Sequence, residues 1–191
     1  MPAMDSPASL ANHFLIALPA LEDPNFSRGV TLLCQHNEEG AMGILINRAS
    51  DFTLGDILGQ MDIPCEDDAL SATPVLSGGP IQRERGFVLH SPDRDQWDSS
   101  FRVSAELCLT TSRDILVAMA EGKGPKHAVV ALGYAGWSAG QLESELQEDA
   151  WLTVPADLGV LFRTGIEQRW MAAARLIGLD LSQLAPYSGH A

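Results

Sequence analysis

Short apolar runs, close together and separated by turn residues, are the feature that most limits what this chain can fold into. The clearest pair is VTLLCQHN (30–37) and GAMGILINR (40–48), which are joined by the polar segment NEEG. Two apolar runs with so short a polar connection predict a β-hairpin. The same criteria predict further strands at 13–19, 75–80, 85–92, 101–111, 126–135 and 151–156.

Helical patterns are fewer and do not alternate regularly with the predicted strands. They are predicted at 53–61, 112–122, 139–148 and 164–178. The class is therefore predicted as α+β, with a mixed or largely antiparallel sheet. The chain has 191 residues, and 46% of them are hydrophobic. Because no repeat or linker divides it, we expect a flexible leader at 1–12 and a single domain at 13–191.

The balance of charges limits the classes of partner. The chain carries 25 acidic and 12 basic side chains, a net charge of −13, and has no Lys or Arg from His127 to Phe162. Direct binding to nucleic acid is therefore not expected, because it depends on Lys and Arg at the phosphates. Three widely spaced cysteines, no recognisable signal peptide and no long apolar run predict a cytoplasmic protein without a membrane partner.

One short motif raises the possibility of catalysis. Gly136-Trp137-Ser138-Ala139-Gly140 matches the G-x-S-x-G nucleophile elbow of α/β-hydrolases, between a predicted strand and a predicted helix. A hydrolase would also need a histidine held beside the serine. After Ser138 the only histidine is His190, next to the last residue, where chains are usually mobile. A hydrolase using Ser138 is therefore the alternative hypothesis, and no catalytic residue is predicted.

A structural role explains the same serine more simply. Ser138 and Gln141 have the spacing of a capping box, in which the two side chains satisfy amides at the start of a helix. The spacing recurs in this chain at three places: Thr53 with Asp56, Thr111 with Asp114, and Thr164 with Glu167. We therefore interpret Ser138 as a helix cap.

A metal site is a second route to catalysis. Cys34 and His36 lie two apart on a predicted strand and would share a face, where His90 could join them as a ligand. None of the ligand spacings typical of metal sites is present. A packed cysteine beside a hydrogen-bonded histidine is the preferred interpretation, so no metal and no cofactor is predicted.

Several longer segments, in one order, resemble the YqgE/AlgH family over nearly the whole chain. They are HFLIALPALEDPNFSRGVTLLCQHNEEGAMGILINR, LSGGPIQRERGFVLHSP, TTSRDIL and VVALGYAGWSAGQLESELQEDAWLTVPAD. The resemblance implies a single α+β domain whose bifurcated sheet forms a pseudo-barrel with flanking helices. The family has no established biochemical activity and is often labelled a transcriptional regulator through a link to alginate production. Its members can carry glutamate at the position of Ser138, which argues against a nucleophile.

Glycine pairs at strand ends suggest where a site would lie. Glycines cluster after two apolar strands, and such strand ends often carry binding residues. The predicted binding surface consists of Gly78, Gly79, His90, Tyr134, Trp137, Gln141 and Glu145. Two alternatives stay open: the glycines only allow tight turns, and Trp137 packs over a sheet edge instead of being half exposed. The predicted function is a non-enzymatic binding or regulatory protein that contacts a protein partner or a small ligand.

Overall fold

The computed structural model describes residues 9–18, 28–93 and 96–178. Most of the predicted leader, and His190, lie outside the described residues. The strands are β1 (His13–Ala17), β2 (Val30–Asn37), β3 (Gly40–Leu45), β4 (Ala49–Thr53), β5 (Pro74–Ser77), β6 (Ile81–His90), β7 (Ser100–Ser104), β8 (Leu107–Thr110), β9 (Ala128–Ser138) and β10 (Trp151–Pro155). The helices are α1 (Leu54–Gln60), α2 (Asp68–Ser71), α3 (Arg113–Ala120), α4 (Gln141–Gln147), α5 (Leu158–Phe162) and α6 (Arg169–Arg175).

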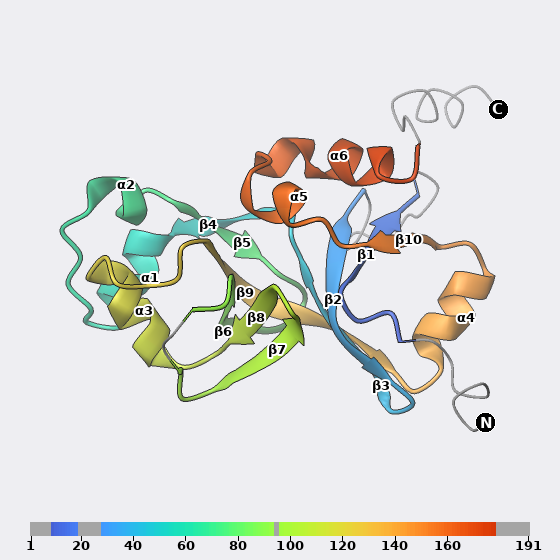
Figure 1. Ribbon diagram of the computed structural model, residues 1–191, viewed down its shortest axis with the longest axis horizontal. Helices are drawn as coiled ribbons and strands as arrows, with labels where there is room; N and C mark the ends of the chain where they lie inside the picture. The colour runs from blue at the N-terminus through green and yellow to red at the C-terminus, as the bar shows by residue number, and fades with distance from the viewer. Residues whose placement is uncertain (1–8, 19–27, 94–95, 179–191) are drawn as a thin grey trace.

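The strands form one curved, mixed sheet in the order β10-β1-β2-β3-β9-β6-β8-β7. All neighbours on this path are antiparallel, whereas β5 runs parallel to β9 and pairs with β4. Strand β9 is where the sheet divides, because it pairs with β3 over 135–138 and with β6 and β5 nearer its start. The predicted class, a single α+β domain with a bifurcated sheet, is confirmed, and the sheet curls into a half-barrel (Figure 1).

The helices cover different parts of this sheet (Figure 1). Helices α5 and α6 pack over the central core, in which Trp170 lies with Phe14 and Leu32. Helices α1 and α3 close a second cluster over one face of β6 and β9. Helix α4 closes a third, which contains Trp137 and Trp151. Among the described helices, none is long and apolar enough to cross a membrane.

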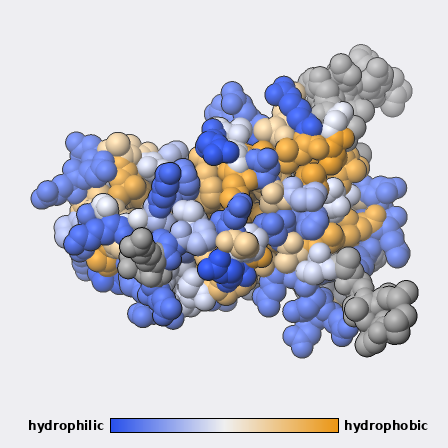
Figure 2. Space-filling model, in the orientation of Figure 1, coloured by the Kyte–Doolittle hydropathy of each residue, from blue (hydrophilic) through white to orange (hydrophobic). Residues whose placement is uncertain are grey.

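Hydrophobic residues also reach the surface near α6 and near α1 (Figure 2). The large hydrophobic side chains with the greatest exposure are Phe52, Phe101 and Leu176, with 39–41% of their surface accessible. They lie on β4, on β7 and at the end of α6. Single apolar side chains at a surface are common, so only their surroundings can give them meaning.

Several elements differ from the sequence predictions. The predicted strand 101–111 is a hairpin, β7 and β8, whose turn is supported by the Glu106 amide donating to Ser104 Oγ. Short or polar elements were missed, namely β4, α2 and α5. The helix predicted at 164–178 is a 3₁₀ turn (Ile166–Gln168) followed by the shorter α6.

The helix caps are also only partly as predicted. The Thr53–Asp56 capping box at the start of α1 is confirmed, with both reciprocal hydrogen bonds present. The box at Thr111 is wrong, because Ser112 is the N-cap residue of α3 and Asp114 accepts its hydroxyl. The box at Thr164 is wrong too, because that hydroxyl donates back to the Gly159 carbonyl.

Candidate binding groove

The Gly78-Gly79 turn lies against β9 at very short range. The Gly78 amide donates to the Leu132 carbonyl at 2.7 Å, and its own carbonyl accepts from the Leu45 amide at 2.8 Å. A Cβ atom on Gly79 would lie 2.1 Å from the Tyr134 carbonyl carbon. These glycines are therefore explained by a close approach of two backbones, and the Gly78 amide is already bonded within the protein.

Ser138 ends β9, and the motif around it is not a nucleophile elbow. Its hydroxyl lies 3.2 Å from Gln141 Oε1, which also accepts from the Ser138 amide at 3.0 Å. The N-cap residue of α4 is Gly140, with φ 77° and no side-chain cap. The predicted box is thus half correct: Gln141 reaches back to the Ser138 amide, but Ser138 is not the cap. Within the described residues, no histidine bonds to Ser138.

Trp137 is buried, so its packing role is the one the structure supports. Only 6% of its surface is accessible, and its indole meets that of Trp151 edge to face. The two indole N–H groups donate to Glu145 Oε1 at 3.0 and 2.9 Å, and Gln141 Nε2 donates to Glu145 Oε2. Glu145 and Gln141 therefore fasten α4 to the ends of β9 and β10.

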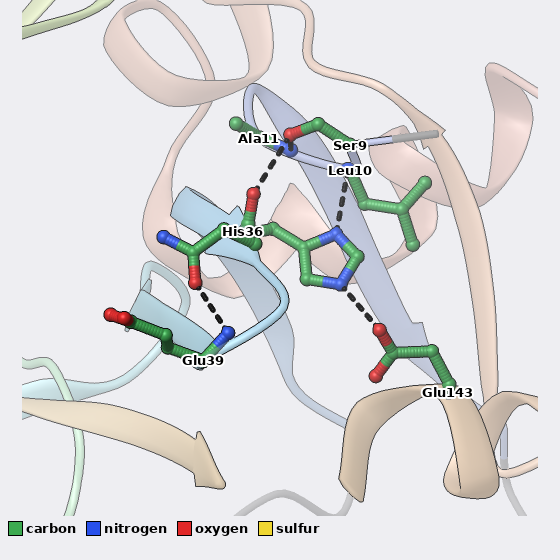
Figure 3. Close-up of polar contacts among 7 residues, drawn as sticks. Ser9, Leu10, Ala11, His36, Glu39 and Glu143 are labelled. Carbon is green, nitrogen blue, oxygen red and sulfur yellow. Dashed lines mark hydrogen bonds and ion pairs between the residues drawn. The ribbon is translucent and has the colours of Figure 1, made fainter. Parts of the chain in front are cut away.

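His36 links three segments of the chain through hydrogen bonds (Figure 3). Its Nδ1 accepts from the Leu10 amide at 2.9 Å, so in the neutral ring Nε2 carries the proton and donates to Glu143 Oε2 at 3.1 Å. The pKa of Glu143 is lowered by its own backbone amide at the start of α4 and by the His36 hydrogen bond. His36 is thus occupied in joining the N-terminal segment, β2 and α4.

The metal hypothesis is wrong in its geometry. A β-bulge between Leu33 and Gln35 reverses the alternation of β2, so Cys34 lies in the central core and His36 points toward α4. His90 pairs with Ala128 at the other end of β9. The described residues contain no group of three His, Cys, Asp or Glu placed to hold a metal. Burial raises the pKa of the Cys34 thiol to about 12.

His90 also lies apart from the rest of the predicted surface. It is 1% exposed, with Nδ1 2.8 Å from the Ser91 carbonyl oxygen and Nε2 2.7 Å from Thr110 Oγ1. Both ring nitrogens therefore have partners within the sheet. Of the seven residues predicted for binding, two, Tyr134 and Trp137, line one common hollow.

That hollow, which we call the groove, is an open depression of about 720 Å³. Strands β3, β6, β8 and β9 contribute to it, together with β7 and the residue before it. The groove is lined by Ala41, Met42, Ile81, Arg85, Phe87, Ser99, Phe101, Leu109, Thr111, Tyr134, Gly136, Trp137 and Ser138. Gly79 lies against the backbone of Tyr134, and Gly78 against that of Gly133. The Trp137 indole donates to Glu145, which also accepts from Gln141.

The groove is aromatic, and its charge is the reverse of the molecule's. Phe87 and Tyr134 meet edge to face at 5.6 Å, and the Arg85 guanidinium lies 5.5 Å from the Phe87 ring centre. Phe101 is 40% exposed beside them. Among the residues that the structure describes, no acidic side chain lines the groove, although the chain has a net charge of −13. Such a surface suits an apolar or aromatic group, neutral or negatively charged.

Most of the residues that line the groove were not predicted from the sequence. Met42, Arg85, Phe87 and Phe101 come from three strands that only the sheet order brings together. The one local signal was Phe101, a large apolar side chain in a polar segment of the sequence.

Comparison with known proteins identifies the family to which this fold belongs. The AlgH-like family model matches residues 14–182, most of the chain. The chain belongs to the AlgH-like family. The resemblance seen in the sequence motifs is therefore confirmed.

Relatives within the AlgH-like family are similar over their full length. A UPF0301 protein of Xanthomonas campestris pv. campestris strain B100 is 60% identical over 185 residues, which cover 97% of this chain and 98% of the relative. The solution structure of AlgH from Pseudomonas aeruginosa is 47% identical, covers 94% of each chain and has a TM-score of 0.79. The crystal structure of DIP2367 from Corynebacterium diphtheriae, 21% identical over 96% of this chain and 95% of its own, has a TM-score of 0.73 and supports the fold alone.

Proposed function

We propose that this AlgH-like protein is a non-catalytic binding protein that acts through the groove. The observation that carries the proposal is an open surface with aromatic side chains, whose described lining contains no acidic residue, on a strongly acidic chain. The expected occupant is an apolar or aromatic group of a partner protein or of a small ligand. A regulatory role would follow from such contacts.

The setting that we propose is the cytoplasm, without direct contact to nucleic acid. An excess of 13 negative charges repels phosphate backbones over most of the surface. The regulation proposed here therefore works through protein or small-ligand contacts.

The test uses the full chain as bait. Proteins recovered from lysate are identified by mass spectrometry, and the dissociation constant of each purified candidate is then measured for wild type and variants. Phe101→Ser removes the most exposed aromatic side chain of the groove. We expect it to weaken binding about tenfold or more, the size typical of an aromatic residue at the centre of an interface.

A matched control separates the groove from general surface apolarity. Leu176→Ser removes a side chain of nearly equal exposure (39% against 40%) that lines neither the groove nor the pocket described below. We expect this variant to bind as wild type does. Equal affinities for wild type, Phe101→Ser and Arg85→Gln would show that the groove is not the binding surface.

A further inference from the structure

A second hollow lies on the other face of the strands that form the groove. It is a cavity of about 560 Å³ between α1, α3 and the sheet, which we call the α1–α3 pocket. Phe87 faces the groove, whereas Gly86 and Val88 face this pocket, because neighbouring side chains of a strand alternate between its faces. The pocket is lined by Phe52, Ile57, Gln60, Met61, Arg83, Glu84, Gly86, Val88, Thr110, Thr111, Ser112, Arg113, Leu116, Val130 and Leu132.

The inner walls of this pocket are aliphatic. Ile57 comes from α1, Leu116 from α3, and Val88 and Val130 from the sheet, and all four belong to one buried cluster. Its size is within the range of small-molecule sites, about 300–1,000 Å³. The aliphatic inner walls therefore suit a flexible hydrocarbon chain.

The rim of the pocket carries two cations and one acid. Arg83 comes from β6, Arg113 is the first residue of α3, and Glu84 is the acid. One N–H of the Arg113 guanidinium donates to the Met61 carbonyl oxygen at 3.1 Å. The Arg83 guanidinium makes no hydrogen bond or ion pair with the described residues. Guanidinium groups bind carboxylates through paired, parallel hydrogen bonds.

The polar groups deeper in the pocket are already engaged. The Thr110 hydroxyl bonds to His90, the Thr111 hydroxyl to Ser99, and the Ser112 hydroxyl donates to Asp114. The Gln60 amide and the two arginines are thus the lining groups with donors still available, and of these the arginines carry the positive charge that suits a negatively charged ligand.

From this arrangement we infer that the α1–α3 pocket binds an aliphatic carboxylate. The hydrocarbon chain lies between α1, α3 and β6, and the carboxylate meets Arg83 and Arg113 at the rim. This site is separate from the groove and does not depend on the function proposed for it.

Gly86 offers a way to fill the pocket without strain. A Cβ atom at Gly86 would meet no atom within 4 Å, and the backbone there does not have a positive φ. Gly86→Leu therefore puts a side chain into the space that the ligand would occupy. Gly59, on the exposed side of α1, also has open space at its Cβ and lies outside the lining, so Gly59→Leu is the matched control.

The experiment is a calorimetric titration of the full chain with octanoate and, in parallel, with octanamide. The two probes share a hydrocarbon chain and differ in the charge of the head group. We expect octanoate to bind more tightly than octanamide, and Gly86→Leu to weaken both by about tenfold or more. Arg83→Gln and Arg113→Gln should each weaken octanoate binding about three- to tenfold and leave octanamide binding unchanged. Gly59→Leu should bind both probes as wild type does.

Three results would overturn the inference, and a fourth would move the site to the groove. The first is no octanoate binding by wild type at millimolar concentration, and the second is equal affinity for the two probes. The third is unchanged octanoate affinity in the arginine variants, which does not depend on Gly86→Leu remaining folded. Amide spectra of each variant check its fold, and loss of octanoate binding in Phe101→Ser would move the site to the groove.

Discussion

Two turn glycines that look alike in the sequence, Gly79 and Gly140, meet different physical requirements in the structure. At the β5–β6 turn, Gly79 is required by contact, because any side chain there would collide with the backbone of Tyr134. At the β9–α4 turn, Gly140 has a left-handed backbone and open space around it. Gly79 thus allows two backbones to approach closely, whereas Gly140 only turns the chain. A cluster of glycines is thus a poor sign of a binding site by itself.

The sharpest test of this contrast is Gly79→Ala. The new methyl group would lie 2.1–2.5 Å from backbone atoms of Tyr134 and Ala135, at a φ of +156°. Because backbone cannot move aside cheaply, we expect a loss of about 3 kcal/mol or more in the free energy of unfolding, measured in urea. Gly86→Ala, where the space is open, should change stability by no more than about 0.5 kcal/mol. Similar losses in the two variants would contradict the contact argument.

The next largest effect is expected behind the β9–α4 turn, at Glu145. Glu145→Ala removes the acceptor of two indole N–H groups and of Gln141 Nε2. Losing such partners costs about 2–3 kcal/mol of stability. Glu145→Gln keeps an oxygen for the indoles and should cost clearly less. If the two variants are equally unstable in thermal melts, the negative charge matters more than the hydrogen bonds.

Gly140 should be more tolerant than Gly79. Gly140→Asn places a residue that accepts positive φ into open space, whereas Gly140→Val introduces a branched side chain that does not. We expect the valine variant to lose about 1–2 kcal/mol and the asparagine variant less than about 1 kcal/mol. A loss at Gly140→Asn as large as that at Gly79→Ala would remove the distinction between the two turns.

The first turn of α4 should also give a small dependence of stability on pH. Folding lowers the pKa of Glu143, so its contribution is complete above about pH 4.3, the usual value, and is lost as pH falls through the lower folded value. Water screens this partly exposed carboxylate, so the contribution is at most about 1 kcal/mol. Glu143→Gln, which can still accept from His36, should flatten the profile of stability between about pH 5 and pH 3. An unchanged profile would show that other carboxylates account for it.

Ser138 is expected to have the smallest effect. Because Gly140 is the N-cap residue, Ser138→Ala removes only the hydroxyl contact with Gln141 and should cost less than about 0.5 kcal/mol. A fluorophosphonate probe should not label the residue. Covalent labelling of Ser138 would revive the hydrolase alternative.

What the sequence could predict was local. The β2–β3 hairpin and the Thr53 capping box depend on neighbouring residues, and both were found. The bulge after Leu33 inserts one residue into β2, whose side chains otherwise alternate between the two faces of the sheet. The surrounding sequence, TLLCQH, contains no glycine or proline that would indicate a bulge. The groove depends on β3, β6 and β9 lying side by side, which only long-range pairing determines. The sequence left open whether Trp137 packs or is half exposed, because the acceptor of its indole N–H, Glu145, belongs to the next helix.

The core cysteine gives this fold a built-in reporter of its own opening. Cys34 is buried, and its thiol stays protonated at any physiological pH because its pKa is raised to about 12. The thiolate is the form that attacks alkylating reagents, so in the closed protein this sulfur does not react with them. Cys65, which is partly exposed on the loop before α2, reacts without any opening of the protein. Its modification rate therefore serves as an internal reference for the reactivity of the reagent. The ratio of the two modification rates therefore reports how often the central core around Cys34 opens, in a protein that carries no added label.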